Sequence, residues 1–241
     1  MLTPFNEIPA AQRVIVALDC DKPEALRLAE LLSGKATWLK VGMTLFYAEG
    51  PSIVKRFKEL GFKVFLDLKF HDIPHQVEGA AASAVASGAD MLTMHASGGV
   101  DMMRAAQRGV ERVCAETGRE LPATLGITVL TSMDADTLRR IGVDLPLTDQ
   151  VAALARLTQE AGISGVVASP QEAGMLRELL GPDAYIVTPG VRPAGAALGD
   201  QSRVATPEAA FKAGSSHIVI GRPITQADDP AAAFEAIVSS L

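Results

Sequence analysis

Residues Phe62–Val77 read FKVFLDLKFHDIPHQV and pass from an apolar run into a charged turn. The run carries Asp67 and Lys69 among its last residues before the turn His71-Asp72-Ile73-Pro74 stops it. Because the side chains of a strand alternate between its two faces, Asp67 and Lys69 should point the same way. If the run is a strand of a parallel α/β protein, these charges, and Asp72 in the turn, lie at the end where such proteins bind ligands.

Seven other short apolar runs flank this strand and alternate with helical patterns. Strands are expected over Arg13–Asp19, Thr37–Val41, Phe62–Lys69, Asp90–His95, Thr124–Leu130, Gly165–Ser169, Tyr185–Thr188 and His217–Ile220. Helices are expected over Pro23–Leu32, Pro51–Leu60, Val77–Ser87, Val100–Thr117, Asp149–Ala161, Gln171–Leu180 and Pro230–Ser240. Eight strand-helix units in 241 residues predict a closed (β/α)8 TIM barrel rather than an open, doubly wound sheet.

No linker divides the chain, so residues 1–241 are expected to form a single α/β domain. The longest irregular segment is Pro189–Pro207, which contains several glycines and prolines. Loops of this length in compact domains are usually lids or binding loops. We therefore expect Pro189–Pro207 to close over a ligand.

Composition and charge exclude several classes of protein. Hydrophobic residues make up 48% of the chain and its net charge is −6, which fits a buried core and disfavours general binding to nucleic acids or membrane surfaces. The two cysteines, Cys20 and Cys114, have no metal-site or disulfide spacing. An export signal and an apolar run of about 18 residues are both missing from the sequence. A cytoplasmic protein is the expectation.

Four charges of alternating sign fall at the ends of the first three predicted strands: Asp19, Lys40, Asp67 and Lys69. One such charge is ordinarily a solvated rim residue or part of a structural ion pair, but four are harder to explain in that way. Crowded like charges push one pKa toward neutrality, whereas interleaved opposite charges can all stay ionised. A protonated lysine between carboxylates suits proton donation, or stabilisation of a carbanion, better than attack on a carbonyl.

Other chemistries fit this set of residues less well. Lysine is not a usual ligand of divalent metals, so no metal ion is expected. A Schiff base at Lys69 or Lys40 stays an alternative, although the flanking aspartates favour the protonated amines. The sequence lacks a Gly-x-Ser-x-Gly elbow, a Gly-x-Gly-x-x-Gly fingerprint after the first strand and a Walker sequence.

Glycine and arginine follow the last two predicted strands. Thr188–Arg192 reads TPGVR, and Gly221-Arg222 comes directly after the eighth strand. Barrels often bind phosphate at these places, where glycine lets backbone N–H groups approach the anion and a guanidinium matches its oxygens. Either feature alone would be a turn glycine beside a solvated arginine. Together they predict a phosphate site made by Arg192, Gly221 and Arg222.

The octapeptide Asp67–Pro74, DLKFHDIP, closely resembles the signature of the orotidine 5'-phosphate decarboxylase family. Blocks that resemble the family's other motifs occur in the same order, at Val16–Asp19, Leu39–Gly42, Leu130–Ser132, Thr188–Pro193, Gly199–Gln201 and Ile220–Pro223. The Asp-x-Lys-x-x-Asp spacing alone is less specific, because related metal-dependent sugar-phosphate barrels share it. The resemblance is therefore carried by the whole set of blocks.

The resemblance implies cofactor-free decarboxylation of orotidine 5'-monophosphate to UMP in a homodimeric barrel whose sites are completed across the interface. Lys69 would donate the proton to C6 of the pyrimidine, with Asp67 near the departing carboxylate. Lys40 and Asp19 would extend the charge network to the ribose. The remaining contacts would be Asp72 and Ile73 from the partner subunit, Thr131 at the pyrimidine, Gln201 between base and phosphate, and Arg192, Gly221 and Arg222 at the phosphate.

One position departs from the family, and two other functions stay open. Gln76 stands where the family usually has Thr, so the ribose contact of this position is in doubt. The first rival function is a magnesium-dependent sugar-phosphate decarboxylase or aldolase-like enzyme that uses the carboxylates as ligands. The second is a catalytically silent, phosphate-binding barrel.

Overall fold

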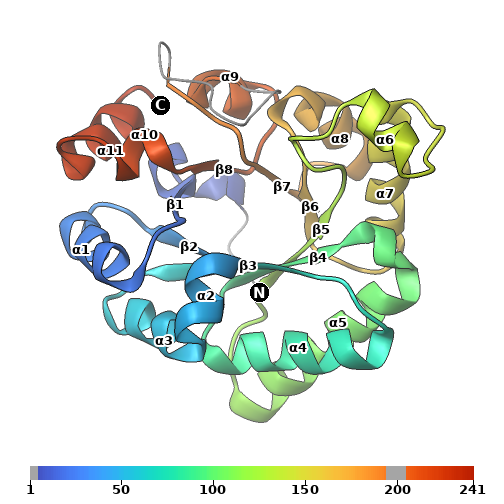
Figure 1. Ribbon diagram of the computed structural model, residues 1–241, viewed down its shortest axis with the longest axis horizontal. Coiled ribbons are helices and arrows are strands. Elements are labelled where there is room, and N and C mark those ends of the chain that lie inside the picture. The colour runs from blue at the N-terminus through green and yellow to red at the C-terminus, as the bar shows by residue number, and fades with distance from the viewer. Residues whose placement is uncertain (1–4, 194–204) are drawn as a thin grey trace.

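Eight parallel strands form a closed barrel in the part of the chain that a computed structural model describes, residues 5–193 and 205–241 (Figure 1). They are β1 (Val14–Leu18), β2 (Trp38–Gly42), β3 (Lys63–Phe70), β4 (Met91–His95), β5 (Ala123–Ile127), β6 (Gly165–Val167), β7 (Tyr185–Thr188) and β8 (His217–Ile220). Pairing of β8 with β1, through Val14 beside Ile218, closes the ring. The predicted (β/α)8 barrel is confirmed, although β5 and β6 end earlier than expected.

Helices surround the barrel on its outer side (Figure 1). The outer ring contains α1 (Lys22–Leu32), α3 (Pro51–Glu59), α4 (Pro74–Ser87), α5 (Gly99–Thr117), α7 (Leu147–Glu160), α8 (Ala173–Leu180), α9 (Pro207–Lys212) and α11 (Pro230–Ser239). Shorter helices follow strands β2, β5 and β8, namely α2 (Met43–Glu49), α6 (Ala135–Arg140) and α10 (Arg222–Thr225). Among the described residues, no helix is long and apolar enough to cross a membrane.

The strands form because their side chains are apolar on both faces. All five residues of β1, VIVAL, are buried, as expected for a parallel strand that is covered by helices outside and by the barrel core inside. Helices contribute apolar stripes of helical period. In α5, Met102, Met103, Ala106, Val110 and Val113 are buried.

Aromatic side chains close the N-terminal end of the barrel. Trp38, Tyr185 and His217 begin β2, β7 and β8, and the ring of His217 lies 5.6 Å from that of Trp38 and 5.5 Å from that of Tyr185. Phe5, in the 3-10 helix η1 (Phe5–Glu7), packs edge-on against Tyr185 with ring centroids 5.9 Å apart. We call these four residues the aromatic floor. These rings do not cover the opposite, C-terminal end of the barrel, which can therefore accept a ligand.

Strand β3 is irregular at this C-terminal end. Leu66 is paired with Leu92 of β4, but the next pair is Phe70 with Met94, so β3 takes four steps where β4 takes two. The two extra residues form a bulge, which the sequence prediction of a regular strand through Lys69 did not contain. Lys69 has φ of 56°, and in the described part of the chain it is the one non-glycine residue with positive φ.

The predicted lid begins and ends beside the barrel mouth. The backbone N–H of Arg192 donates to the carbonyl of Ala205 at 3.0 Å, which joins the two ends of the segment after β7. Residues 194–204 lie outside the described residues. The expectation that Pro189–Pro207 closes over a ligand therefore concerns mostly residues that the structure does not describe, and it stays a prediction.

Candidate active site

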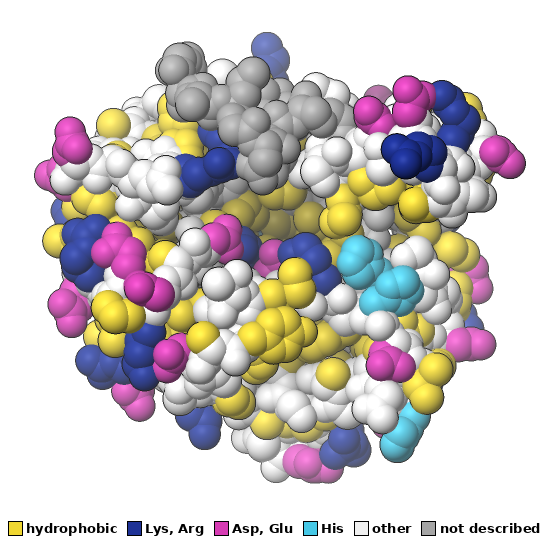
Figure 2. Space-filling view, in the orientation of Figure 1, with side chains coloured by type: hydrophobic (Ala, Val, Ile, Leu, Met, Phe, Trp, Pro, Cys, Tyr) yellow, Lys and Arg dark blue, Asp and Glu magenta, His cyan; other side chains and the backbone are white. Residues whose placement is uncertain are grey.

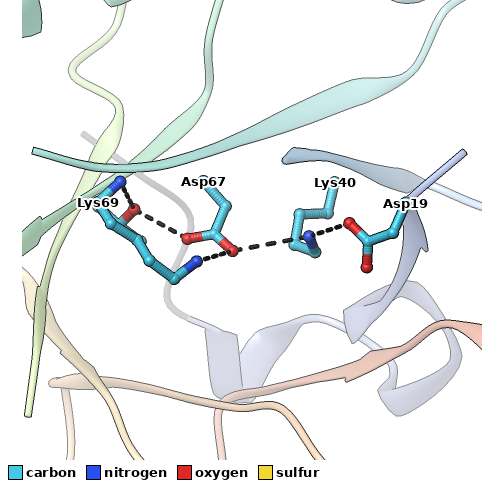
Figure 3. Close-up of polar contacts among 5 residues, drawn as sticks. Asp19, Lys40, Asp67 and Lys69 are labelled. Atoms are coloured by element: carbon cyan, nitrogen blue, oxygen red, sulfur yellow. Dashed lines mark hydrogen bonds and ion pairs between the residues drawn. The ribbon is translucent and has the colours of Figure 1, made fainter. Parts of the chain in front are cut away.

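Four charged side chains lie in a row across the C-terminal ends of β1, β2 and β3 (Figure 3). The Nζ of Lys40 is 2.9 Å from Oδ1 of Asp19 and 3.6 Å from Oδ2 of Asp67. The Nζ of Lys69 is 2.7 Å from the same Oδ2 of Asp67. We call the row Asp19–Lys40–Asp67–Lys69 the charge chain. Its signs alternate, so every contact within it is attractive.

The register of the strands places these groups side by side. Lys40 of β2 is paired with Ala17, two residues before Asp19, and Asp67 of β3 is paired with Gly42, two residues after Lys40. Gly42 also leaves the space that the side chains of Asp19 and Lys40 occupy. A Cβ at this position would lie 2.9 Å from Oδ1 of Asp19 and 3.1 Å from Nζ of Lys40.

A residue that the sequence prediction missed supports the charge chain from β4. The hydroxyl of Thr93 donates to Oδ1 of Asp67 at 2.9 Å and accepts from the backbone N–H of Lys69 at 3.0 Å. Thr93 has no exposed surface. The available signal was a single hydroxyl in the otherwise apolar middle of Met91–His95, next to the strand that carries Asp67.

Burial and mutual attraction both act on the central pair of the charge chain. Burial alone would raise the pKa of the Asp67 carboxyl, but the charges of Lys40 and Lys69 and the hydrogen bonds from Lys69 and Thr93 hold that pKa below its usual value. Burial would likewise lower the pKa of the Lys40 amine, and the charges of Asp67 and Asp19 outweigh it and raise that pKa. Both groups are therefore ionised at neutral pH.

A cavity of about 640 Å³ opens above the charge chain. Loops after other strands complete its wall: Thr131 follows β5, Gly190 and Arg192 follow β7, and Gly221 and Arg222 follow β8. Arg192 is buried, and Gly190 has φ of 78°, which favours glycine. Figure 2 shows a hollow at the centre of this face, bordered by apolar, acidic and basic side chains.

Apolar side chains form the base of the cavity. Ile127, Val167 and Val219 line it, which lowers the local dielectric and strengthens the interactions of the charges beside them. Cys20 also lines the cavity, but burial and then neighbouring carboxylates raise the pKa of its thiol to about 11. This thiol is protonated at neutral pH and is a poor nucleophile. The reactive groups of the cavity are its lysines, carboxylates and arginines.

Comparisons with known proteins identify the family. The sequence model of the orotidine 5'-phosphate decarboxylase / HUMPS family matches residues 12–237. The chain belongs to this family. It is 49% identical to orotidine 5'-phosphate decarboxylase of Moorella thermoacetica over 234 residues, which cover 96% of this chain and 93% of the relative. It is 51% identical to the enzyme of that name from Cutibacterium acnes over 227 residues, covering 93% of this chain and 94% of the relative.

Solved structures give the same result for the fold. The crystal structure of orotidine 5'-phosphate decarboxylase from Lactobacillus acidophilus matches with a TM-score of 0.84 at 40% identity, covering 95% of this chain and 98% of that chain. The resemblance that the sequence motifs indicate, to a family of carboxy-lyases, is therefore confirmed.

Three positions that the decarboxylase resemblance assigns to the site lie outside the cavity of their own chain. Asp72, Ile73 and Gln76 are all exposed, and none of them lines the cavity. Oδ1 of Asp72 accepts from the backbone N–H of Ile73 at 2.6 Å. Gln201 lies outside the described residues. The structure thus brings together Asp19, Lys40, Asp67, Lys69, Thr131, Arg192, Gly221 and Arg222 around one cavity.

Proposed function

We propose that this chain decarboxylates orotidine 5'-monophosphate to UMP, the last step of de novo pyrimidine nucleotide synthesis, without a cofactor or a metal ion. The observation that carries the proposal is the charge chain, in which the amine of Lys69 lies 2.7 Å from Asp67 in the same cavity as Arg192 and Arg222. The names of the curated relatives support the same reaction. Orotidine 5'-monophosphate carries a carboxylate, which fits beside Lys69, and a phosphate, which fits beside Arg192 and Arg222.

The chemical step needs a charge and a proton at the same place. Loss of CO₂ breaks the bond between C6 and the carboxylate and leaves the electron pair on C6, which has no adjacent carbonyl to receive it. The ammonium group of Lys69 stabilises this charge and then transfers a proton to C6, and the resulting amine regains a proton from water. A fixed charge that is aimed at the developing carbanion is worth about 3 kcal/mol or more in a dry site.

The other members of the charge chain prepare Lys69 for this step. Asp67 holds the amine of Lys69 in place at 2.7 Å, and the charge of Lys40 keeps Asp67 ionised. Asp67 also lies close to the departing carboxylate, where repulsion between like charges is relieved as CO₂ leaves. Lys40 and Asp19 reach the ribose, and Thr131 contacts the pyrimidine.

The phosphate is bound away from the reacting carbon. Arg192, Gly221 and Arg222 hold it, and Gln201 bridges the base and the phosphate from the segment after β7. Energy from this remote contact can drive closure over the substrate, so that phosphate binding raises the rate as well as the affinity.

We further propose a homodimer in which Asp72 and Ile73 complete the partner's site. Exposed apolar side chains support this, since Met43 and Tyr47 of α2 are 44% and 75% exposed and Ile73 is 64% exposed. Met43 and Tyr47 follow β2 and Ile73 follows the neighbouring strand β3, so these exposed side chains come from adjacent strand ends at the same end of the barrel. Exposed apolar side chains that gather in one region mark contacts with other proteins. Asp72 also faces solvent instead of its own cavity.

The same structure supports proposals for the domain organisation and the compartment. We propose that residues 1–241 are one domain, because β1 and β8, from the two ends of the chain, pair with each other to close the barrel. A reducing cytoplasm is proposed because Cys20 and Cys114 are both free thiols.

The hydrogen bonds of Asp67 favour this function over a magnesium-dependent enzyme. Oδ1 accepts from Thr93, and Oδ2 accepts from Lys69 and faces Lys40, so both oxygens already have partners and two positive charges beside Asp67 would repel a divalent cation. Among the residues that the structure describes, no three His, Cys, Asp or Glu side chains are grouped so that they could hold a metal ion.

A spectroscopic assay tests the proposal. Purified protein is expected to consume orotidine 5'-monophosphate, seen as loss of its ultraviolet absorbance, at the same rate with and without a chelator. Lys69→Ala should abolish turnover and still bind UMP in a calorimeter, because it removes the proton donor but leaves the phosphate contacts. Lys63→Ala, which removes an exposed amine from the opposite end of the same strand, serves as the matched control and should keep its activity.

Each alternative predicts a different result. Turnover that requires added Mg²⁺ would support the metal-dependent enzyme, and UMP binding without any turnover would support the silent barrel. Normal activity of Lys69→Ala would show that another group donates the proton.

A further inference from the structure

We propose that Thr93 is a positioning residue of this active site, whose hydroxyl fixes both the carboxylate of Asp67 and the backbone of Lys69. The inference rests on the proposed function, because it concerns the geometry from which Lys69 delivers its proton. Thr93 does not line the cavity, so it acts through these two residues and not on the substrate.

The position of Thr93 in the sheet provides the first argument. Between the pairs Leu66–Leu92 and Phe70–Met94, it is the single residue of β4 that faces the bulge of β3. Backbone N–H groups alternate between the two neighbours of a strand, and Lys63 at the start of β3 donates to Thr37, the residue before β2. In a regular strand the N–H of Lys69, six residues later, would therefore also point toward β2. Here the hydroxyl of Thr93 accepts it instead, at 3.0 Å. The side chain of Thr93 thus provides the partner for a backbone N–H that the bulge turns toward β4.

The carboxylate of Asp67 provides the second argument. Its Oδ2 interacts with the amines of Lys69 and Lys40, while its Oδ1 accepts the hydroxyl of Thr93 at 2.9 Å. The torsion that turns a carboxylate is soft, so its plane is set by its partners. With the hydroxyl present, one oxygen is held by a neutral donor and the other is reserved for the two lysines. Without it, the carboxylate can turn and offer either oxygen to Lys69.

The conformation of Lys69 provides the third argument. A non-glycine residue with φ of 56° is strained by about 1 kcal/mol or more and persists where the surroundings hold it. The hydrogen bond to Thr93 is the contact that holds its backbone N–H. A change in φ of Lys69 would change the direction of its side chain and would therefore move the amine that is proposed to reach C6.

A purely structural role is the competing explanation, and Thr124 provides the matched comparison. Thr124 is also fully buried, in the neighbouring strand β5, and its hydroxyl bonds with Gln107 and Ser164. These contacts reach α5 and the residue before β6, and none of them involves the charge chain. Removal of either hydroxyl should lower stability, but only removal of the Thr93 hydroxyl should disturb the chemical step.

The experiment compares Thr93→Val, Thr93→Ser and Thr124→Val in the full-length chain. Thr93→Val keeps the shape of the side chain but loses the hydroxyl, and it should lower kcat about 10- to 100-fold, as expected for a misplaced reacting group. KM and the UMP dissociation constant should change little, because the phosphate contacts are intact. Thr93→Ser should restore most of kcat. Thr124→Val should lower the melting temperature and leave kcat unchanged.

The proposal is overturned if Thr93→Val turns over like the wild type, or if Thr93→Ser loses as much activity as Thr93→Val. Should Thr93→Val not fold, Thr93→Ala takes its place under the same criteria. If the wild type does not turn over the nucleotide at all, the proposed function fails, and NMR titration of the Asp67 carboxyl decides the role of Thr93. Loss of the hydroxyl should raise the pKa of Asp67, and an unchanged titration would contradict the role.

Discussion

Gly42 shows how closely the charge chain is packed at the scale of single residues. Its φ is −89°, which any residue can adopt, so its backbone does not require glycine. The requirement is steric, because a Cβ would lie 2.9 Å from Oδ1 of Asp19 and 3.1 Å from Nζ of Lys40. One added methyl group must therefore displace the contact between these two side chains.

We predict that Gly42→Ala lowers kcat/KM about tenfold or more while the protein stays folded, because Asp19 and Lys40 can move only by giving up their present geometry. Gly174→Ala is the control, since its new Cβ would lie 3.6 Å from the carbonyl of Ala213, an ordinary contact. Steady-state kinetics and melting temperatures of the two variants check the prediction. Equal activity of both would show that the pair tolerates displacement.

The residues of the charge chain were predictable from sequence for a simple reason. Asp19, Lys40 and Asp67 come at the ends of apolar runs, and the ends of parallel strands meet. Thr93 was not predictable in the same way. Its role depends on the bulge in β3, and a bulge changes which residues face each other without leaving a mark in the apolar pattern.

At the scale of elements, long periodic segments were predicted and short ones were not. All eight strands occur where expected, and α5 differs from its predicted range by one residue at its start. The helices α2, α6, α9 and α10 were missed, because seven, six, six and four residues are too few to show a helical period.

The aromatic floor leads to a prediction about pH. His217 is buried, and burial, followed by the charges of Arg13 and Lys63, lowers its pKa to about 3. Its Nε2 has no hydrogen-bond partner among the residues that the structure describes. In the unfolded chain a histidine titrates near pH 6.5, so below this pH the unfolded state binds a proton that the folded state does not. Stability should therefore fall between about pH 6.5 and pH 3.

We expect His217 to account for about 2 kcal/mol of the unfolding free energy lost between pH 6.5 and pH 5. His217→Phe keeps an aromatic ring beside Trp38 and Tyr185 but cannot bind a proton, so its stability should fall less over this range. Urea unfolding at fixed protein concentration measures both proteins, and the difference between them should be constant above pH 7. Parallel curves at all pH values would show that His217 is not buried as a neutral ring.

At the scale of the whole molecule, the proposed dimer makes each site depend on two chains. Asp72 faces solvent in its own chain, while Lys69 lines the cavity. If Asp72 serves the partner, an Asp72→Asn subunit still supplies Lys69, and a Lys69→Ala subunit still supplies Asp72. A mixed dimer of these two inactive variants contains one native site and one site that lacks both residues.

We predict that co-expression of Asp72→Asn with Lys69→Ala restores about a quarter of the wild-type activity, since half of randomly formed dimers are mixed and each has one native site. Each variant expressed alone should be inactive, and sedimentation should show dimers in all three preparations. If the mixture has no more activity than its components, Asp72 acts within its own chain or not at all.

The balance of charge within the charge chain has a further consequence for how substrate is captured. Two carboxylates and two ammonium groups cancel, so the row itself exerts little attraction on a distant anion, and the protein as a whole carries −6. Arg192 and the exposed Arg222 therefore provide the long-range attraction for an anionic nucleotide. Dissolved ions screen exposed charges but scarcely reach the buried Lys40 and Asp67. A higher ionic strength should thus lower the rate at which the substrate associates with the protein and leave the rate of the bond-breaking step unchanged.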